Sequence, residues 1–229
     1  MEKLLNKAKD IKIIFFDIDD TLRVKDTGFM PASLTHIFEM LHQKGILTGI
    51  ATGRNLCGVV PEIKALHPDF FVTANGAYVI DKSDQVIYKQ SLPQKVVLDI
   101  VEWLTSSSAE YVVYGADQVV ASAWSDTMQS SIEPIYGQLP IDPDYHLTHD
   151  IYQMVTMSEH DDQLILPEKL SESVRMVRWH EHSSDIVPLN GSKAVGVSQV
   201  LDQLGLSVEN VMNFGDGLND VELFDLGGL

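Results

Sequence analysis

Three carboxylates stand close together at the end of an apolar run near the start of the chain. The segment IIFFDIDDTLR, residues 13–23, begins with apolar residues and then places Asp17, Asp19 and Asp20 almost side by side. Like charges at such short spacing raise the pKa of a carboxyl group or require a bound cation. This crowding predicts a site for cation binding or acid–base chemistry.

Three more short polar segments could complete that site. ATGR (51–54) and GDGLND (215–220) each follow an apolar run that is typical of a strand, and GSK (191–193) opens a helical pattern. In an open parallel sheet the ligand crevice lies outside the carboxyl ends of the strands. We therefore expect one set of side chains to converge there: Asp17, Asp19, Thr52, Lys193, Asp216 and Asp220.

This set is suited to phosphoryl transfer. Carboxylates are ligands that Mg²⁺ prefers, while the Lys193 ammonium and the Thr52 hydroxyl could hold phosphoryl oxygens. Asp17 could attack phosphorus and form an aspartyl phosphate. Asp19, two residues along, could protonate the leaving alcohol and later deprotonate water.

The flanking segments predict the elements that position these residues. Residues 30–45 have Pro31 near the start, Gly45 past the end and apolar residues on one helical face. Residues 46–52 and 69–76 read as strands, with a helical stretch over 55–66 that Pro61 breaks. The alternation of strand and helix predicts a doubly wound parallel sheet of the α/β class.

The middle of the chain follows a different pattern, which predicts an insert. Hairpins are expected at 77–90 and 110–124, helices at 93–107 and 125–137, and strands at 152–158 and 173–182. Such antiparallel pairs with interleaved helices indicate an α+β domain. We expect a core over residues 1–82 and 184–229, whose last helix is 192–205, and a second domain over 83–183.

Composition limits the partners and the compartment. The 16 Lys and Arg residues against 33 Asp and Glu give a net charge of −17, which disfavours nucleic acid and anionic membranes. The single cysteine, Cys57, excludes an internal disulfide and is expected to be a small core residue on a helix. Without a signal peptide or an apolar span, the expected location is cytoplasmic. The oligomeric state is not indicated.

The four segments DIDDT, ATGR, NGSK and GDGLND, in this order and with a large insert between the second and third, resemble the motifs of the haloacid-dehalogenase (HAD) superfamily. The position of the insert, and TANGAYV ahead of it, resemble the Cof-type hydrolases, whose cap domain lies there. The resemblance implies a Rossmann-like core, an α+β cap that sets substrate specificity, and a magnesium-dependent phosphatase.

The resemblance also implies individual roles. Asp17 would be the nucleophile and Asp19 the general acid and base, and Thr52 and Lys193 would bind the phosphoryl group. The metal ligands would be Asp216 and Asp220 with Asp17 and the Asp19 backbone carbonyl. Asn219 would orient a metal ligand or contact phosphate, and Asp20 would have no direct role. The expected substrate is a small phosphorylated metabolite, with sugar phosphates first.

Several alternatives remain at this stage. A phosphomutase, a signalling receiver or a phosphometabolite-binding protein without turnover would use similar residues, and DIDDTLRVKDTG could be a calcium loop, although Leu22 occupies its glycine position. Arg54 reads as a structural or rim cation, and His146 and His149 as surface-loop residues. Relatives usually continue past the fourth motif with another strand and helix, so we expect a sheet-edge strand to be missing here.

Overall fold

The computed structural model describes residues 8–226, which form two compact units. The first, here called the core unit, contains residues 8–54, 59–89 and 192–226. The second, here called the insert unit, contains residues 90–191 together with the short segment 55–58. The chain therefore passes between the units at four places. No helix among the described residues is long and apolar enough to cross a membrane.

The core unit is built on a six-stranded sheet in the order β11-β1-β2-β3-β4-β5. Its strands are β1 (Ile13–Phe16), β2 (Leu47–Ala51), β3 (Phe70–Thr73), β4 (Tyr78–Asp81), β5 (Val86–Lys89) and β11 (Val211–Phe214). The first four strands in the spatial order are parallel, and β4 and β5 join as antiparallel strands. The predicted parallel sheet is thus confirmed, with an antiparallel hairpin at one edge and β11 at the other.

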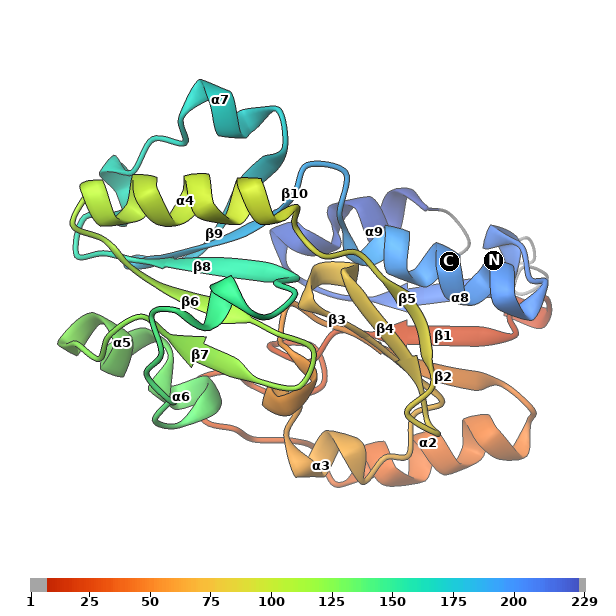
Figure 1. The fold of residues 1–229 in the computed structure, drawn as a ribbon. Coiled ribbons are helices and arrows are strands. Elements are labelled where there is room, and N and C mark those ends of the chain that lie inside the picture. The colour runs from red at the N-terminus through yellow and green to blue at the C-terminus, as the bar shows by residue number, and fades with distance from the viewer. Residues whose placement is uncertain (1–7, 227–229) are drawn as a thin grey trace. The chain divides into compact units, whose positions relative to one another are not determined.

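Both faces of this sheet are covered, which explains why the strands read as continuous apolar runs. Ile13 and Phe15 point into a cluster that includes Val197 and Val200 of helix α8. Phe16 points the other way, with its ring centroid 5.1 Å from that of Phe38. Figure 1 shows α8 and α2 on opposite sides of the sheet. The helical segments of the unit are α2 (Ser33–Gln43), α3 (Pro61–Lys64), η2 (Ala74–Gly76), α8 (Lys193–Leu204), η5 (Val208–Asn210), η6 (Leu218–Asp220) and α9 (Val221–Asp225).

The insert unit has its own five-stranded antiparallel sheet, in the order β7-β6-β8-β10-β9. The strands are β6 (Glu110–Tyr114), β7 (Val119–Ala121), β8 (Gln153–Met157), β9 (Val174–His180) and β10 (Ser183–Pro188). The helical segments are η1 (Leu56–Gly58), α4 (Gln94–Ser106), α5 (Asp126–Ser131), α6 (Glu133–Tyr136), η3 (Tyr145–Leu147), η4 (Asp161–Gln163) and α7 (Glu168–Ser171).

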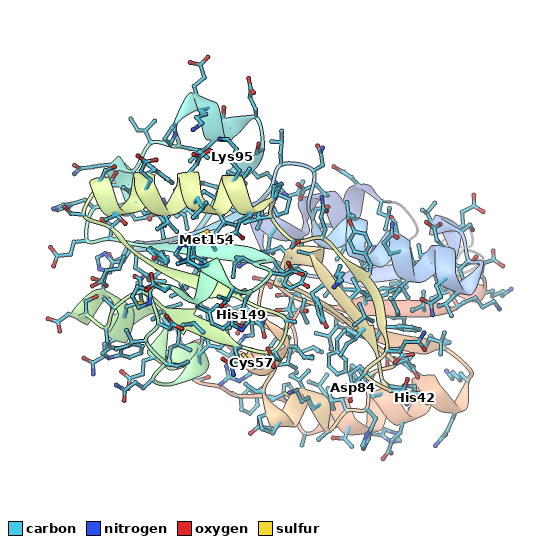
Figure 2. The ribbon with its side chains drawn as sticks, viewed as in Figure 1. His42, Cys57, Asp84, Lys95, His149 and Met154 are labelled. Carbon is cyan, nitrogen blue, oxygen red and sulfur yellow. The ribbon has the colours of Figure 1, made fainter. Side chains whose placement is uncertain are left out.

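A separate hydrophobic core stabilises this second sheet. Ile100 and Leu104 of α4 pack with Val113 of β6, Met154 of β8 and Ile186 of β10. Figure 1 shows α4 and α7 along one side of the sheet, and Figure 2 shows Met154 beneath α4, whose exposed side carries Lys95. Because each unit buries its own apolar cluster, each meets the basic requirement for an independently folded domain.

The two units divide the chain several residues away from the expected domain boundaries. The structure divides the chain after residues 89 and 191, not after residues 82 and 183. Strand β5 stays in the core unit because it pairs with β4, from Tyr78↔Lys89 onward. Strand β10 belongs to the insert unit because it pairs with both β8 and β9. Its sequence, SSDIVP, begins with polar residues and ends in proline, so the sequence pattern did not predict this strand, which lies between β8 and β9.

The expected helix ends are confirmed for two elements, and the helical stretch 55–66, broken at Pro61, is present only as two short pieces. Gly45 and Gly205 adopt positive φ just past α2 and α8. Between residues 55 and 66 the chain forms η1 and the short helix α3, which Pro61 begins. Cys57 lies in η1 and is exposed, so the expected core position is wrong (Figure 2).

Candidate active site

The neighbouring parallel strands of the core sheet have their carboxyl ends side by side. In the register of the sheet, Phe16 of β1 is opposite Ile50 of β2 and Phe214 of β11. Asp17 follows β1 directly, and the Asp17 N–H donates to the Phe214 carbonyl at 2.8 Å. The loops that carry the other expected residues begin after β2 and β11. These segments therefore lie together at the carboxyl ends of the strands, as the sequence predicts.

A tight turn after β1 carries Asp17 and Asp19, the first and third residues that follow the strand. The Ile18 carbonyl accepts the N–H groups of Leu22 and Arg23, at 3.0 and 2.9 Å, and the Ile18 side chain is fully buried. Asp20 has a φ of 59°, a conformation that favours glycine, and its carboxylate accepts the Lys25 N–H at 2.9 Å. Asp20 is thus a turn residue, which agrees with its expected lack of a direct role.

The loop after β11 is organised by a buried carboxylate. Asp220 has no exposed surface, and its carboxylate accepts the N–H groups of Asp216 and Gly217 at 3.2 and 3.0 Å. A Cβ at Gly215 would lie 2.4 Å from the Asp220 Cγ, so only glycine leaves room for this carboxylate. The segment GDGLND therefore forms a compact loop that presents Asp216 outward from a fixed base.

Lys193 links the two ends of the chain. Its helix, α8, begins with Ser192, whose hydroxyl caps the Val195 N–H at 3.3 Å. The Lys193 ammonium is fully buried and donates to Asp17 at 2.7 Å and to Asp220 at 2.8 Å. Burial alone would lower the pKa of Lys193, but the two carboxylates outweigh it and raise the pKa above its ordinary value. The lysine is therefore held as a cation.

The Asp17 carboxyl is electrostatically unusual. Burial raises its pKa to about 6, the Lys193 ammonium opposes this rise, and the Asp220 carboxylate adds to it. At neutral pH the group is mainly ionised, as a nucleophile requires. A strongly perturbed carboxyl at a strand end is typical of functional sites.

Three carboxylates of this site form a cluster that could hold a cation. The ligand atoms of Asp17, Asp216 and Asp220 all lie within 4.8 Å of one another. In residues 8–226 this is the only such group of three or more His, Cys, Asp or Glu side chains. Asp216 is exposed and accepts a hydrogen bond from the Thr21 hydroxyl at 2.7 Å. Thr21 was not expected at the site, although the motif DIDDT contains it.

Asp19 faces a different partner. The Arg54 guanidinium donates to both oxygens of the Asp19 carboxylate, with Nε at 2.8 Å from one and an Nη at 2.7 Å from the other. Arg54 is only 6% exposed, which favours a structural role for this cation. A bidentate contact of this kind fixes the orientation of the carboxylate. The sequence did not predict the pair, because its members lie 35 positions apart.

Thr52 and Asn219 lie on loops that are fixed by neighbouring backbone. The Thr52 N–H donates to the Val72 carbonyl at 2.9 Å, and its hydroxyl accepts the Arg54 N–H at 3.1 Å. The Asn219 side chain donates to the buried Asn75 side chain at 2.9 Å. Asn75 comes from TANG and adopts a φ of 50°. The phosphate-binding roles of Thr52 and Asn219 stay predictions.

The two loop histidines behave differently from the expectation. His146 is buried, in η3, and packs edge-on to Tyr111 at a centroid distance of 6.3 Å. The expected surface position of His146 is therefore wrong. His149 is exposed and stacks on Tyr145 at 3.9 Å. Neither belongs to a cluster of potential metal ligands in residues 8–226.

Comparisons with other proteins identify relatives of this chain. A protein from Streptococcus pyogenes serotype M6, named as a candidate bifunctional phosphatase/peptidyl-prolyl cis-trans isomerase, is 49% identical over 227 residues. The match covers 99% of this chain and 48% of that protein, so the chain spans about half the length of this relative. YkrA of Bacillus subtilis strain 168, named as a candidate phosphatase, is 30% identical over 96% of this chain and 84% of its own length.

A solved structure supports the fold independently. The crystal structure of a hypothetical protein from Geobacillus kaustophilus HTA426 superposes with a TM-score of 0.83 at 33% identity, over 95% of this chain and 85% of that chain. The family model for haloacid dehalogenase-like hydrolases matches residues 14–229. The predicted resemblance to the Cof-type hydrolases is thereby confirmed, and the chain belongs to the haloacid dehalogenase-like hydrolase family.

Proposed function

We propose that this chain is a magnesium-dependent phosphatase that hydrolyses small phosphorylated metabolites through an aspartyl-phosphate intermediate. The observation that carries the proposal is the buried Lys193 ammonium between Asp17 and Asp220, beside the exposed Asp216. Phosphatase is also part of the names of the two relatives from Streptococcus and Bacillus. Sugar phosphates are the first substrate class to test.

The residues present fit a hard divalent cation. Three carboxylates offer oxygen atoms within 4.8 Å of one another, with Asp216 on the exposed side. Oxygen-only donor sets are the ones that Mg²⁺ prefers, with water and phosphate completing the shell. Asp17, Asp216 and Asp220 would hold the ion together with the Asp19 backbone carbonyl. When bound, the ion would neutralise charge on the phosphoryl oxygens and on the crowded carboxylates.

The first half-reaction uses both aspartates of the turn. An Asp17 carboxylate oxygen attacks phosphorus, and the bond from phosphorus to the ester oxygen breaks. Asp19 gives its proton to that departing oxygen, which leaves as an alcohol. Lys193 and Thr52 hold the phosphoryl oxygens, and Asn219 contacts the phosphate or orients a ligand. The product of this step is phospho-Asp17.

The second half-reaction restores the enzyme. The Asp19 carboxylate takes a proton from water, whose oxygen attacks phosphorus. The bond between phosphorus and the Asp17 oxygen breaks, which releases inorganic phosphate and the free Asp17 carboxylate. Asp19 ends this step protonated, ready for the next ester. The insert unit would act as a cap that admits small substrates and excludes bulk water from phospho-Asp17.

Asp17→Asn tests this proposal against a closely matched control. We expect Asp17→Asn to lower kcat by about a thousandfold or more, because the amide is a poor nucleophile. Asp20→Asn, three positions away in the exposed turn, should retain activity near that of the unsubstituted chain. The measurement is phosphate release from a panel of phosphometabolites with Mg²⁺ and with EDTA.

The same assay separates the alternatives. Accumulation of a phosphate isomer in place of inorganic phosphate would indicate a phosphomutase. Metabolite binding by a folded, metal-loaded chain without turnover would indicate a binding protein. Turnover that survives Asp17→Asn would refute the proposed nucleophile.

A further inference from the structure

The segment that follows ATGR leaves the core unit for only four residues. Arg54 belongs to the core unit, whereas Asn55–Gly58 belong to the insert unit, and the chain returns to the core unit at Val59. Arg54 is the residue that grips both oxygens of the Asp19 carboxylate. A single peptide bond therefore joins the partner of the proposed general acid to the insert unit.

Asn55 is fixed by four hydrogen bonds. It is 2% exposed, and its side-chain NH₂ donates to the Gly115 carbonyl at 2.7 Å. Its side-chain oxygen accepts the Cys57 N–H at 2.9 Å, and its carbonyl accepts the Gly58 N–H at 2.9 Å. Its backbone N–H, which lies on the peptide bond from Arg54, donates to the Tyr136 hydroxyl at 2.9 Å. A buried asparagine with these partners has little freedom to move.

Tyr136 contacts both Asn55 and Gly58. Its hydroxyl donates to the Tyr114 hydroxyl at 3.0 Å, and the two rings meet edge to face at 5.8 Å. Its ring lies directly on Gly58, where an added Cβ would come within 2.2 Å of a ring carbon. We call Asn55, Gly58 and Tyr136 the clamp. The clamp fixes Asn55 to Gly115, directly after β6, and both Asn55 and Gly58 to Tyr136 of α6.

The Thr52 backbone is held apart from the clamp, although the Thr52 hydroxyl accepts the Arg54 N–H at 3.1 Å. This backbone is held within the core unit by the Val72 carbonyl at 2.9 Å and by the Asn75 N–H, which donates to the Thr52 carbonyl at 3.1 Å. Arg54 is joined to Asn55 of the clamp by one peptide bond and donates to both oxygens of Asp19. The Thr52 backbone is thus fixed within the core unit, whereas Arg54 is the last core-unit residue before the clamp.

We propose that Asn55 and Tyr136 are positioning residues, which hold Arg54 so that the Asp19 carboxyl is oriented for proton transfer. This inference rests on the proposed function, because it gives the clamp a role in the same reaction. The clamp acts through Arg54 and does not touch the substrate. Its loss should therefore slow the step that needs a proton and spare the binding of phosphate.

Tyr136→Phe is the direct test, since it removes the hydroxyl and keeps the ring over Gly58. Two substrates separate proton transfer from binding: p-nitrophenyl phosphate, whose leaving group departs without a proton, and phenyl phosphate, whose leaving group benefits from one. We expect kcat for phenyl phosphate to fall about tenfold more than kcat for p-nitrophenyl phosphate. Inhibition by inorganic phosphate should change by less than about twofold.

Two further variants make the result specific. Gly58→Ala should displace the Tyr136 ring without removing its hydroxyl, and it should give the same selective loss. Tyr111→Phe is the matched control, because it deletes another tyrosine hydroxyl of the insert unit, one that donates to the Pro143 carbonyl at 3.0 Å. It should leave the ratio of the two rates unchanged. Equal losses on both substrates in Tyr136→Phe, or no loss, would overturn the inference.

Amide hydrogen exchange examines the clamp without turnover. Peptides that cover residues 52–58 should exchange faster in Tyr136→Phe and Gly58→Ala than in Tyr111→Phe or the unsubstituted chain. Unchanged exchange would refute the clamp even if activity changed. If the unsubstituted chain hydrolyses neither substrate, the proposed function fails, and the exchange experiment still decides whether these residues hold Arg54.

Discussion

At the scale of single residues, the main feature of the site is a group of buried charged side chains. Lys193 and Asp220 are fully buried, and Asp17 nearly so, which only close pairing makes tolerable. One ammonium faces two carboxylates at 2.7 and 2.8 Å, so the group carries a net negative charge before any cation arrives. The cluster of buried charges therefore has an unfavourable electrostatic energy.

The pH dependence of stability should reveal this energy. The pKa of Asp17 is about 6 in the folded chain against 3.8 ordinarily, so the folded state binds the proton more tightly than the unfolded state. Between pH 3.8 and about 6 the contribution of this group to stability therefore falls as pH rises. The full cost, on the order of 3 kcal/mol, is present above that range.

Asp17→Asn should remove this part of the pH dependence. The measurement is urea unfolding in EDTA across the pH range, for the unsubstituted chain and the variant. Asp20→Asn, which alters an exposed turn carboxylate, should keep the same slope as the unsubstituted chain. Identical slopes for Asp17→Asn and the unsubstituted chain would show that the raised pKa is wrong.

At the scale of elements, the site depends on a close approach between η2 and α8. Gly76 has a φ of 92°, and a Cβ there would lie 2.0 Å from the Ser192 carbonyl oxygen. Gly196, one turn into α8, faces the same place, with its own Cβ position 2.9 Å from the Gly76 Cα. Two glycines thus let the start of α8 approach the TANG turn, and Lys193 depends on that position.

Gly76→Ala should be strongly destabilising for this reason. We expect a loss of at least about 2 kcal/mol, from left-handed backbone strain together with the clash. Gly45→Ala is the matched control, because Gly45 has a φ of 71° but nothing within 4 Å of its Cβ position. It should cost about 1 kcal/mol, from strain alone. Equal losses in urea denaturation would show that the close approach does not matter.

At the scale of the whole molecule, the two units bury separate clusters of apolar side chains. The proposed cation ligands Asp17, Asp216 and Asp220 all belong to the core unit. A ligand that binds only the folded form of one unit stabilises that unit by mass action. Thermal unfolding is thus expected to involve more than one cooperative step, and a cation should act on only one of them.

Differential scanning calorimetry can test this expectation. With Mg²⁺ at a hundredfold excess over its Kd, the core-unit transition should gain about 2.7 kcal/mol, which raises its Tm on the order of 10 °C. The insert-unit transition should stay in place. In Asp216→Asn the shift should largely disappear. A single transition whose calorimetric and van't Hoff enthalpies agree would contradict the independence of the units.

The sequence predicted those parts of the molecule that local patterns determine. Asp17 and Asp216 could be placed together because each follows an apolar strand, and Lys193 because GSK opens a helical pattern. The pairing of Arg54 with Asp19 could not be predicted, since it depends on two loop conformations. Strand β10 was missed because Ser183 and Ser184 are polar yet buried, and the Ser184 hydroxyl is paired with the buried Asp161 at 2.6 Å.

The four-residue excursion at 55–58 has a practical consequence for engineering. A chimera that grafts the insert of another family member between residues 89 and 192 would keep this excursion from the host. Asn55 would then meet a foreign replacement for Gly115, and Gly58 one for Tyr136. Exchanging substrate preference between relatives should therefore succeed more often when residues 55–58 are taken from the donor as well, which needs four junctions in place of two.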